Sequence, residues 1–210
     1  MTTLLVIAKQ PLPGRVKTRL TPPFTPDEAA ALAEAALADT LDAALGVPAD
    51  RHVLVLDGQP GAWLPPGFQV VPQTAGGLDV RLAAAFATCA GPALLIGMDT
   101  PQATPALLTP ALRWESYDAW FGPASDGGSW ALGLASPEPA LLLGVPMSRP
   151  DTGAVQYGRL RAAGLRIGTL PVLRDVDTAE DACVVAAQTP GSRFAALHSV
   201  LTATAAGAGA

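Results

Sequence analysis

The sequence predicts an α/β fold, a three-layer α/β/α sandwich built around a mainly parallel mixed sheet. Short apolar runs with strand character alternate with alanine-rich runs of helical character along the whole chain. This alternation is typical of strand–helix–strand units, whose strands pair in parallel. The run Ala93-Leu-Leu-Ile-Gly97 is continuously apolar, as expected of a central strand that is buried on both faces.

The first half of the chain supplies most of the expected parallel strands. We expect strands at 2–8, 52–57, 68–72 and 93–97. A helix is expected from Pro26 to Leu45, because Thr25 can act as its N-cap and Glu28 can close a capping box. Gly46 stands just past its end, where glycine commonly terminates helices. A second helix is expected at 78–89.

The second half continues the alternation with shorter elements. We expect helices around 104–113, 152–163, 178–188 and 192–203, and strands at 117–121, 130–134 and 166–170. The strand at 130–134 follows its predecessor closely through Asp126-Gly-Gly128, which favours an antiparallel or edge position. Residues 1–201 are expected to form one domain. The tail 202–210 has no pattern and few large side chains, so we expect it to be disordered.

Composition restricts the function. The chain has 210 residues, a net charge of −5, and no aromatics interleaved with Lys and Arg, so a nucleic-acid binder is not expected. No stretch approaches the roughly 20 apolar residues of a membrane span, and the short apolar N-terminus does not resemble a secretory signal. Cys89 and Cys183 have no metal-ligand spacing. We expect them to be buried thiols in helical segments of a cytoplasmic protein.

The loop after the first expected strand carries an unusual concentration of positive charge. It runs from the apolar Leu4–Ile7 stretch through prolines and Gly14 to Leu20. Four of the chain's thirteen Lys and Arg residues lie there: Lys9, Arg15, Lys17 and Arg19. Backbone N–H groups at a glycine and fixed cations together suit a bound phosphate, and ligands of open α/β sheets gather at the carboxyl ends of strands. A solvated charged loop is the alternative.

Three aspartates stand at strand ends beside glycine or proline. Asp99 follows the buried strand in Gly97-Met-Asp-Thr-Pro101, Asp126 lies in Gly122-Pro-Ala-Ser-Asp-Gly-Gly128, and Asp177 lies in Arg174-Asp-Val-Asp-Thr178. Carboxylates that converge at this edge of the sheet would form a site for Mg²⁺ or Mn²⁺, which normally also holds substrate phosphates.

Each aspartate also has a structural interpretation. Asp99 could shape a turn before Thr-Pro, and Asp126 could shape a hairpin before Gly-Gly. Asp177 could interact with the dipole of the helix that follows it. The position of Asp99 favours a functional role over a structural one. For Asp126 the two interpretations are balanced. Asp177 by itself would be interpreted as structural, and only its combination with the other loops favours a functional role.

Five ordered motifs resemble those of the nucleotide-diphospho-sugar transferase superfamily of GT-A fold. The closest similarity is to bacterial glycosyltransferases of the arsenosugar-biosynthesis type, which are related to phospholactate and molybdopterin guanylyltransferases. The motifs are Ala8–Leu20, Gln73 through Arg81-Leu82, Gly97–Pro101, Gly122–Gly128 and Arg174–Asp181.

The resemblance implies a role for each motif. It places Lys9, Gly14, Arg15, Lys17 and Arg19 at the nucleotide phosphates, and Gln73 and Arg81 near the nucleotide. It makes Asp99 and Asp177 metal ligands and puts Asp126 on the acceptor side. Lys17 would assist catalysis by neutralising phosphate oxygens, and Asp126 would be the catalytic base or acceptor carboxylate.

Three functions fit these residues. The leading hypothesis is a Mg²⁺- or Mn²⁺-dependent transferase that moves the sugar of a nucleotide diphosphate sugar to a small acceptor. A nucleotidylyltransferase would use the same site for an NTP and release pyrophosphate. A non-catalytic nucleotide-binding protein is the third hypothesis, because a single Asp99 stands where many GT-A enzymes have a paired Asp-x-Asp. The sequence sets no oligomeric state.

Overall fold

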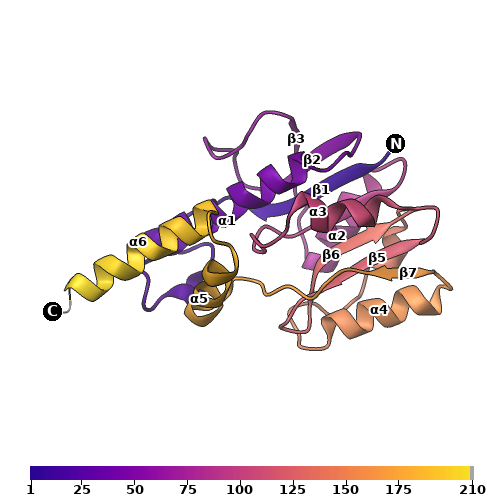
Figure 1. The fold of residues 1–210 in the computed structure, drawn as a ribbon. Helices are drawn as coiled ribbons and strands as arrows, with labels where there is room; N and C mark the ends of the chain where they lie inside the picture. The colour runs from indigo at the N-terminus through magenta and orange to yellow at the C-terminus, as the bar shows by residue number, and fades with distance from the viewer. Residues whose placement is uncertain (209–210) are drawn as a thin grey trace.

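The structure, a computed structural model, describes residues 1–208 and is built on a seven-stranded sheet (Figure 1). The strand order is β3-β2-β1-β4-β6-β5-β7. The strands are β1 Thr3–Lys9, β2 Arg51–Asp57, β3 Phe68–Pro72, β4 Ala93–Ile96, β5 Ala119–Pro123, β6 Ser129–Leu134 and β7 Ile167–Thr169. This is the mainly parallel mixed sheet that the sequence predicts.

Strand β6 is antiparallel to both of its neighbours, β4 and β5. The remaining neighbouring pairs are parallel. The turn between β5 and β6 is too short for a crossover helix, so the chain reverses there, as the Asp126-Gly-Gly128 spacing predicts. From β1 the chain order runs outward to β2 and β3 on one side, and β4 lies on the other side. The carboxyl ends of β1 and β4 therefore flank a topological switch point, where ligands of such sheets bind.

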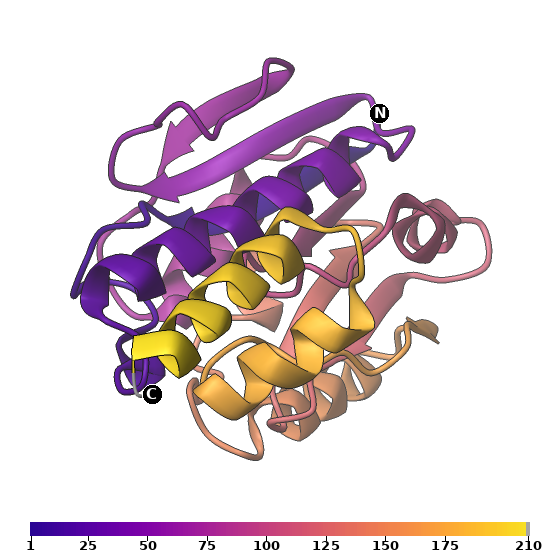
Figure 2. The same cartoon turned by 60° about the vertical axis from the view of Figure 1, so that its left-hand side comes forward.

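Helices cover both faces of the sheet. They are α1 Pro26–Leu45, α2 Leu78–Ala87, α3 Pro105–Leu108, α4 Thr152–Ala162, α5 Ala179–Gln188 and α6 Arg193–Ala208, with short 3₁₀ helices at Thr18–Leu20, Thr109–Leu112 and Pro139–Leu141. Figure 2 shows α1 and α6 running side by side on one face, with α5 beside them.

Alternation along β1 divides the core between the two faces. Leu4 and Val6 pack in a cluster with Leu37 of α1, whereas Leu5 packs in a second cluster with Phe86 of α2. Successive side chains of a strand point to opposite faces, so an uninterrupted apolar strand feeds both clusters. A third cluster, which includes Phe194 of α6, joins α1, α5 and α6 outside the sheet.

Several predicted boundaries are confirmed and others shift. The capping box of Thr25 and Glu28 forms at the start of α1, and Gly46 caps its end. The helix expected around 104–113 splits into α3 and a 3₁₀ helix, because Pro110 lacks the N–H that an α-helix needs there. Helix α6 continues to Ala208, beyond the expected end at 203. The disorder expected for 202–210 stays a prediction, and residues 209–210 lie outside the described residues.

The two cysteines differ from expectation. Cys89 is partly exposed and lies just after α2, while Cys183 is exposed on α5. The prediction of a buried thiol is wrong for Cys183, because α5 turns Ala182 and Val185 toward the core and Cys183 toward solvent. Among residues 1–208, no helix has the length and apolar character needed to cross a membrane.

Candidate active site

A pocket of about 680 Å³ opens where β1 and β4 end. One side is formed by the segment Lys9–Arg19 (the basic loop), and the other by aspartates from three separate segments (the acidic wall): Asp99, Asp126, Asp175 and Asp177. Trp130 also lines the pocket. The site thus lies at the switch point of the sheet, the position that strand order alone favours for a ligand.

Buried apolar residues anchor the basic loop. Val16 is 7% exposed and Leu20 is fully buried, so the charged residues between and before them are presented from a fixed backbone. Gly14 adopts φ 71, a left-handed conformation that glycine accepts without strain. Gly14 itself is not among the described residues that line the pocket. The four cations of the loop do line it: Lys9, Arg15, Lys17 and Arg19.

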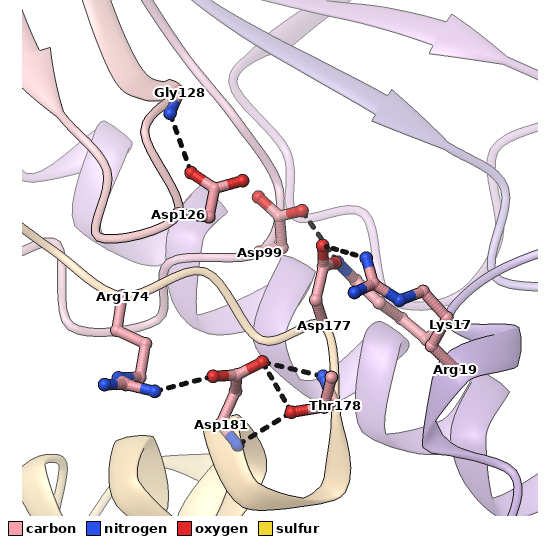
Figure 3. Close-up of polar contacts among 9 residues, drawn as sticks. All are labelled: Lys17, Arg19, Asp99, Asp126, Gly128, Arg174, Asp177, Thr178 and Asp181. Carbon is pink, nitrogen blue, oxygen red and sulfur yellow. Dashed lines mark hydrogen bonds and ion pairs between the residues drawn. The ribbon is translucent and has the colours of Figure 1, made fainter. Parts of the chain in front are cut away.

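Lys17 connects the basic loop to the acidic wall. Its Nζ donates hydrogen bonds to Asp99 Oδ2 at 2.7 Å and to Asp177 Oδ1 at 2.8 Å (Figure 3). Burial alone would lower the pKa of Lys17, but the two carboxylates more than compensate and raise it above its ordinary value. Lys17 is therefore charged throughout the physiological pH range. Arg19 adds a second, looser ion pair with Asp177 at 3.3 Å.

Asp99 and Asp177 come from distant segments that backbone contacts hold together. Asp99 follows β4, and Asp177 precedes the N-cap of α5, Thr178. The backbone N–H of Val176 donates to the Asp99 carbonyl at 2.9 Å. The Gln102 side chain donates to the Arg174 carbonyl at 2.9 Å. One backbone hydrogen bond and one side chain-to-backbone hydrogen bond thus hold the two segments together.

Asp126 lies in the turn between β5 and β6. Its Oδ1 accepts a hydrogen bond from the backbone N–H of Gly128 at 2.8 Å (Figure 3). The hairpin-shaping role that the sequence suggested is therefore present, and the same carboxylate also lines the pocket. Gly127 is required here: it has φ 90, and a Cβ would lie 1.9 Å from the Pro150 carbonyl oxygen.

Asp175 is the site residue that the sequence analysis missed. Its Oδ1 is buried and finds no hydrogen-bond partner in the described part of the chain. Burial first, and then the nearby charges of Asp99 and Asp126, raise the pKa of Asp175 to about 8. The sequence held a signal for it, since the spacing Asp-x-Asp puts Asp175 and Asp177 on the same side of an extended segment.

Gln73 and Arg81 also line the pocket, tied to the ends of the parallel strands. The Gln73 amide donates to the carbonyl of Ala8 at 2.7 Å and to that of Val55 at 3.1 Å. The Arg81 guanidinium donates to Asp57 at 2.9 Å and to Gln73 at 3.0 Å. Protein acceptors therefore already hold one edge of Arg81, so both residues brace this end of the pocket.

The acidic wall has the donor chemistry of a hard divalent cation. No three His, Cys, Asp or Glu side chains are arranged as a ready-made metal site within residues 1–208. Within the described residues, the wall nevertheless carries four carboxyl groups against the two cations that pair with it, and one buried carboxyl oxygen, Asp175 Oδ1, has no hydrogen-bond partner. Mg²⁺ and Mn²⁺ prefer oxygen ligands of this kind, so the residues present fit such an ion.

Solved structures show the same fold. A protein of Desulfovibrio desulfuricans G20, provisionally named a nucleotide-diphospho-sugar transferase, is 28% identical over 98% of this chain and 95% of its own, with a TM-score of 0.84. Rv0371c of Mycobacterium tuberculosis H37Rv, solved as a manganese complex, is 22% identical over 88% of this chain and 96% of its own, with a TM-score of 0.55. A Methanothermobacter nucleotidyl transferase is 15% identical over 88% of this chain and 95% of its own, with a TM-score of 0.57.

These similarities confirm the predicted GT-A type of α/β fold. No curated protein matches the chain. Residues 31–149 match the family model of DUF2064, described as an uncharacterized protein conserved in bacteria. The matched segment contains the loops of Asp99 and Asp126 and the end of the pocket braced by Gln73 and Arg81. The chain therefore belongs to the DUF2064 family and has the fold of nucleotide-diphospho-sugar transferases.

Proposed function

We propose that this protein is a metal-dependent transferase that binds a nucleotide diphosphate sugar and transfers the sugar to a small acceptor. One observation carries the proposal. Cations of a single loop face carboxylates of three other segments across one pocket at the switch point of the sheet. The likeness to the Desulfovibrio structure supports this choice of donor.

The basic loop would bind the diphosphate. Arg15 and Arg19 can each direct paired N–H donors at phosphate oxygens, and Lys17 supplies a compact charge deeper in the pocket. Lys9 extends the positive surface at the end of β1. When the bond to the sugar breaks, negative charge develops on the departing diphosphate, and fixed cations at that point stabilise it. Gln73 and Arg81 would support the nucleotide at the other end of the pocket.

Asp99 and Asp177 are the residues that would hold a divalent metal, with Asp175 beside them. A bound Mg²⁺ or Mn²⁺ supplies Lewis-acid stabilisation of the diphosphate oxygens. The protein's own contribution is to hold the two carboxylates from separate segments at a fixed spacing, through the Val176 and Gln102 contacts. The manganese complex of Rv0371c shows that a protein of this fold binds such an ion.

Asp126 would serve the acceptor. It lines the pocket from the β5–β6 turn, and its Oδ1 is fixed by the Gly128 N–H. The Oδ2 of Asp126 is suited to accept the proton of an acceptor hydroxyl while the hydroxyl oxygen of the acceptor attacks the sugar.

Nucleotidyl transfer is the second candidate. The same cations and carboxylates would hold the phosphates of an NTP, an acceptor would attack the α-phosphorus, and pyrophosphate would leave. The Methanothermobacter nucleotidyl transferase favours this candidate because it shares the fold. Products separate the two reactions, since sugar transfer releases a nucleoside diphosphate and nucleotidyl transfer releases pyrophosphate.

A thermal-shift panel of nucleoside triphosphates and nucleotide diphosphate sugars, each with and without Mn²⁺, tests the proposal. A ligand that binds only the folded protein stabilises it by about 2.7 kcal/mol at a hundredfold excess over Kd. The expected hit is a nucleotide diphosphate sugar that stabilises more with Mn²⁺ than without it. Stabilisation by NTPs alone would favour the second candidate. Binding without turnover of any donor would favour a non-catalytic protein, and no stabilisation at all would refute a nucleotide site.

A further inference from the structure

Lys17 differs from the other cations of the basic loop in how deeply it is buried. Its side chain is 11% exposed, whereas that of Arg19 is 71% exposed. Both of its hydrogen-bond partners in the acidic wall are carboxylates, Asp99 and Asp177. The Lys17 ammonium therefore interacts with the acidic wall more than with solvent, although its backbone belongs to the basic loop.

The backbone at Lys17 is shaped to place the side chain there. Lys17 adopts φ 47 and ψ 37, the left-handed conformation, which is unfavourable for a residue with a side chain. The turn is held because the Leu20 N–H donates to the Lys17 carbonyl at 2.9 Å and Leu20 is fully buried. Non-glycine residues in such conformations cluster at functional sites, and here the conformation directs a cation between two carboxylates.

The Lys17 ammonium contacts carboxylate oxygens that a metal held by both Asp99 and Asp177 would use. Asp99 and Asp177 are the residues proposed to hold a divalent ion, and Lys17 Nζ contacts one oxygen of each at 2.7 and 2.8 Å. Mg²⁺ takes oxygen ligands at about 2.0–2.1 Å and would use the lone pairs that accept the Lys17 hydrogen bonds. The ammonium and a metal bridging these two oxygens therefore exclude each other.

We propose that Lys17 is a displaceable counter-cation that competes with the divalent metal for Asp99 and Asp177 and moves to the nucleotide phosphates when metal and nucleotide bind together. This inference rests on the proposed function and adds a rule for the order of binding. Without a nucleotide, entry of a metal leaves the Lys17 charge without its carboxylate partners. With a nucleotide, a phosphate oxygen becomes the new partner.

Metal and nucleotide binding are therefore coupled through Lys17. A metal alone binds weakly because it must expel a paired ammonium, and a metal that arrives with a nucleotide binds well. By linkage, the metal strengthens nucleotide binding by the same factor. The arrangement keeps one positive charge between Asp99 and Asp177 when no metal is bound and limits metal capture without substrate.

Titration of the full-length protein with Mn²⁺, followed by electron paramagnetic resonance of the free ion, tests this inference. In the absence of nucleotide, Lys17→Met is expected to bind Mn²⁺ at least tenfold more tightly than the wild type. In the presence of Mn²⁺, the same variant is expected to bind the nucleotide found in the thermal-shift panel at least tenfold more weakly. Opposite shifts for the two ligands are the signature of a cation that both compete for.

Arg15→Gln is the matched control because it removes one charge from the same loop. No ion pair between Arg15 and an acidic side chain occurs within residues 1–208. This variant is expected to weaken nucleotide binding while changing the affinity for Mn²⁺ alone by less than threefold. An equal gain in Mn²⁺ affinity in both variants would reduce the effect to general electrostatics and overturn the inference.

Two further outcomes separate the inference from the proposed function. If Lys17→Met binds Mn²⁺ no more tightly than the wild type while nucleotide binding persists, the inference fails and the proposed function stands. If the wild type binds no nucleotide with or without Mn²⁺, the proposed function fails. Circular dichroism checks the fold of each variant. Lys17→Gln, which keeps a polar group at this position, gives the same test if the methionine variant does not fold.

Discussion

The basic loop and the acidic wall face each other across one pocket, and they are assembled differently. The basic loop is a single continuous segment that follows β1, anchored by Val16 and Leu20. The acidic wall collects Asp99 from the end of β4, Asp126 from the β5–β6 turn and Asp175 with Asp177 from the segment after β7. One wall is local in sequence, whereas the other exists only because three distant segments meet.

The two walls also differ in their electrostatic state. Arg19 in the basic loop is largely exposed, and its charge is well solvated. In the acidic wall, carboxyl groups crowd together, and the Oδ1 of the half-buried Asp175 is buried without a hydrogen-bond partner among residues 1–208. Crowded carboxylates are unfavourable without a cation. The acidic wall therefore depends on cations that come from elsewhere, first Lys17 and then the proposed metal.

The largest expected effect comes from removing one carboxylate of the acidic wall. Asp99→Asn should abolish the Mn²⁺-dependent part of nucleotide binding, with a loss of at least about 100-fold in affinity, because it removes a charged oxygen ligand. Asp126→Asn should leave nucleotide affinity within threefold and reduce product formation by about 100-fold or more. Calorimetric titration and product analysis check both variants. Unchanged Mn²⁺ dependence in Asp99→Asn would remove this residue from the metal site.

Two glycine substitutions, one beside Asp126 of the acidic wall and one in the basic loop, should differ in their effect on the free energy of unfolding. Gly127→Ala should destabilise the protein by about 3 kcal/mol or more, since it combines a positive φ with a clash of the new Cβ against the Pro150 carbonyl. Gly14→Ala should cost only about 1–2 kcal/mol, because its φ is positive but, apart from its two chain neighbours, no residue of 1–208 has an atom within 4 Å of the added Cβ. Urea unfolding measures both variants. Equal losses would show that the β5–β6 turn relaxes around the added methyl group.

Asp175→Asn should stabilise the protein without ligands. Folding raises the pKa of Asp175 from 3.8 to about 8, so the folded state retains a proton that the unfolded state releases. The wild type therefore loses stability as the pH rises from about 4 to about 8. The variant lacks this loss and should be more stable by at least about 1 kcal/mol at pH 8, since one pKa unit corresponds to about 1.4 kcal/mol.

Urea unfolding of the Asp175→Asn variant and the wild type at pH 4, 6 and 8 measures this difference. The gap between the two proteins should widen steadily across the series. A gap that stays constant with pH would mean that the substitution acts through packing and not through the charge of the acidic wall.

The smallest expected effect lies outside both walls and sets the baseline for their pH dependence. His198 of α6 packs between Phe24 and Phe194, and burial lowers its pKa below 6.5. The unfolded state then takes up a proton first as the pH falls below about 6.5, so the folded state loses stability in that window. The stability that the wild type loses between pH 7 and pH 5 for this reason should be less than about 1 kcal/mol, and His198→Leu should not show this loss. Thermal unfolding followed by circular dichroism measures the difference.

Much of the fold could be predicted because its signals are local. The capping box at Thr25 forms as the sequence indicates, and the buried strand at 93–96 is central as its continuous apolar run requires. Predictions were weaker where long-range packing decides the outcome. The exposure of Cys183 depends on which face of α5 meets α1 and α6, and helical periodicity in a short alanine-rich segment does not specify that face.

The sequence by itself determined the basic loop, since its cations, its glycine and its preceding strand are neighbours along the chain. It also marked Asp99, Asp126 and Asp177 as strand-end carboxylates. Only the tertiary structure decided that these three converge, that Asp175 joins them, and that Lys17 lies between Asp99 and Asp177. The physical reason is that hydrogen bonds and turns are set by adjacent residues, whereas the interaction of charges depends on distances through space that strand order and loop packing fix.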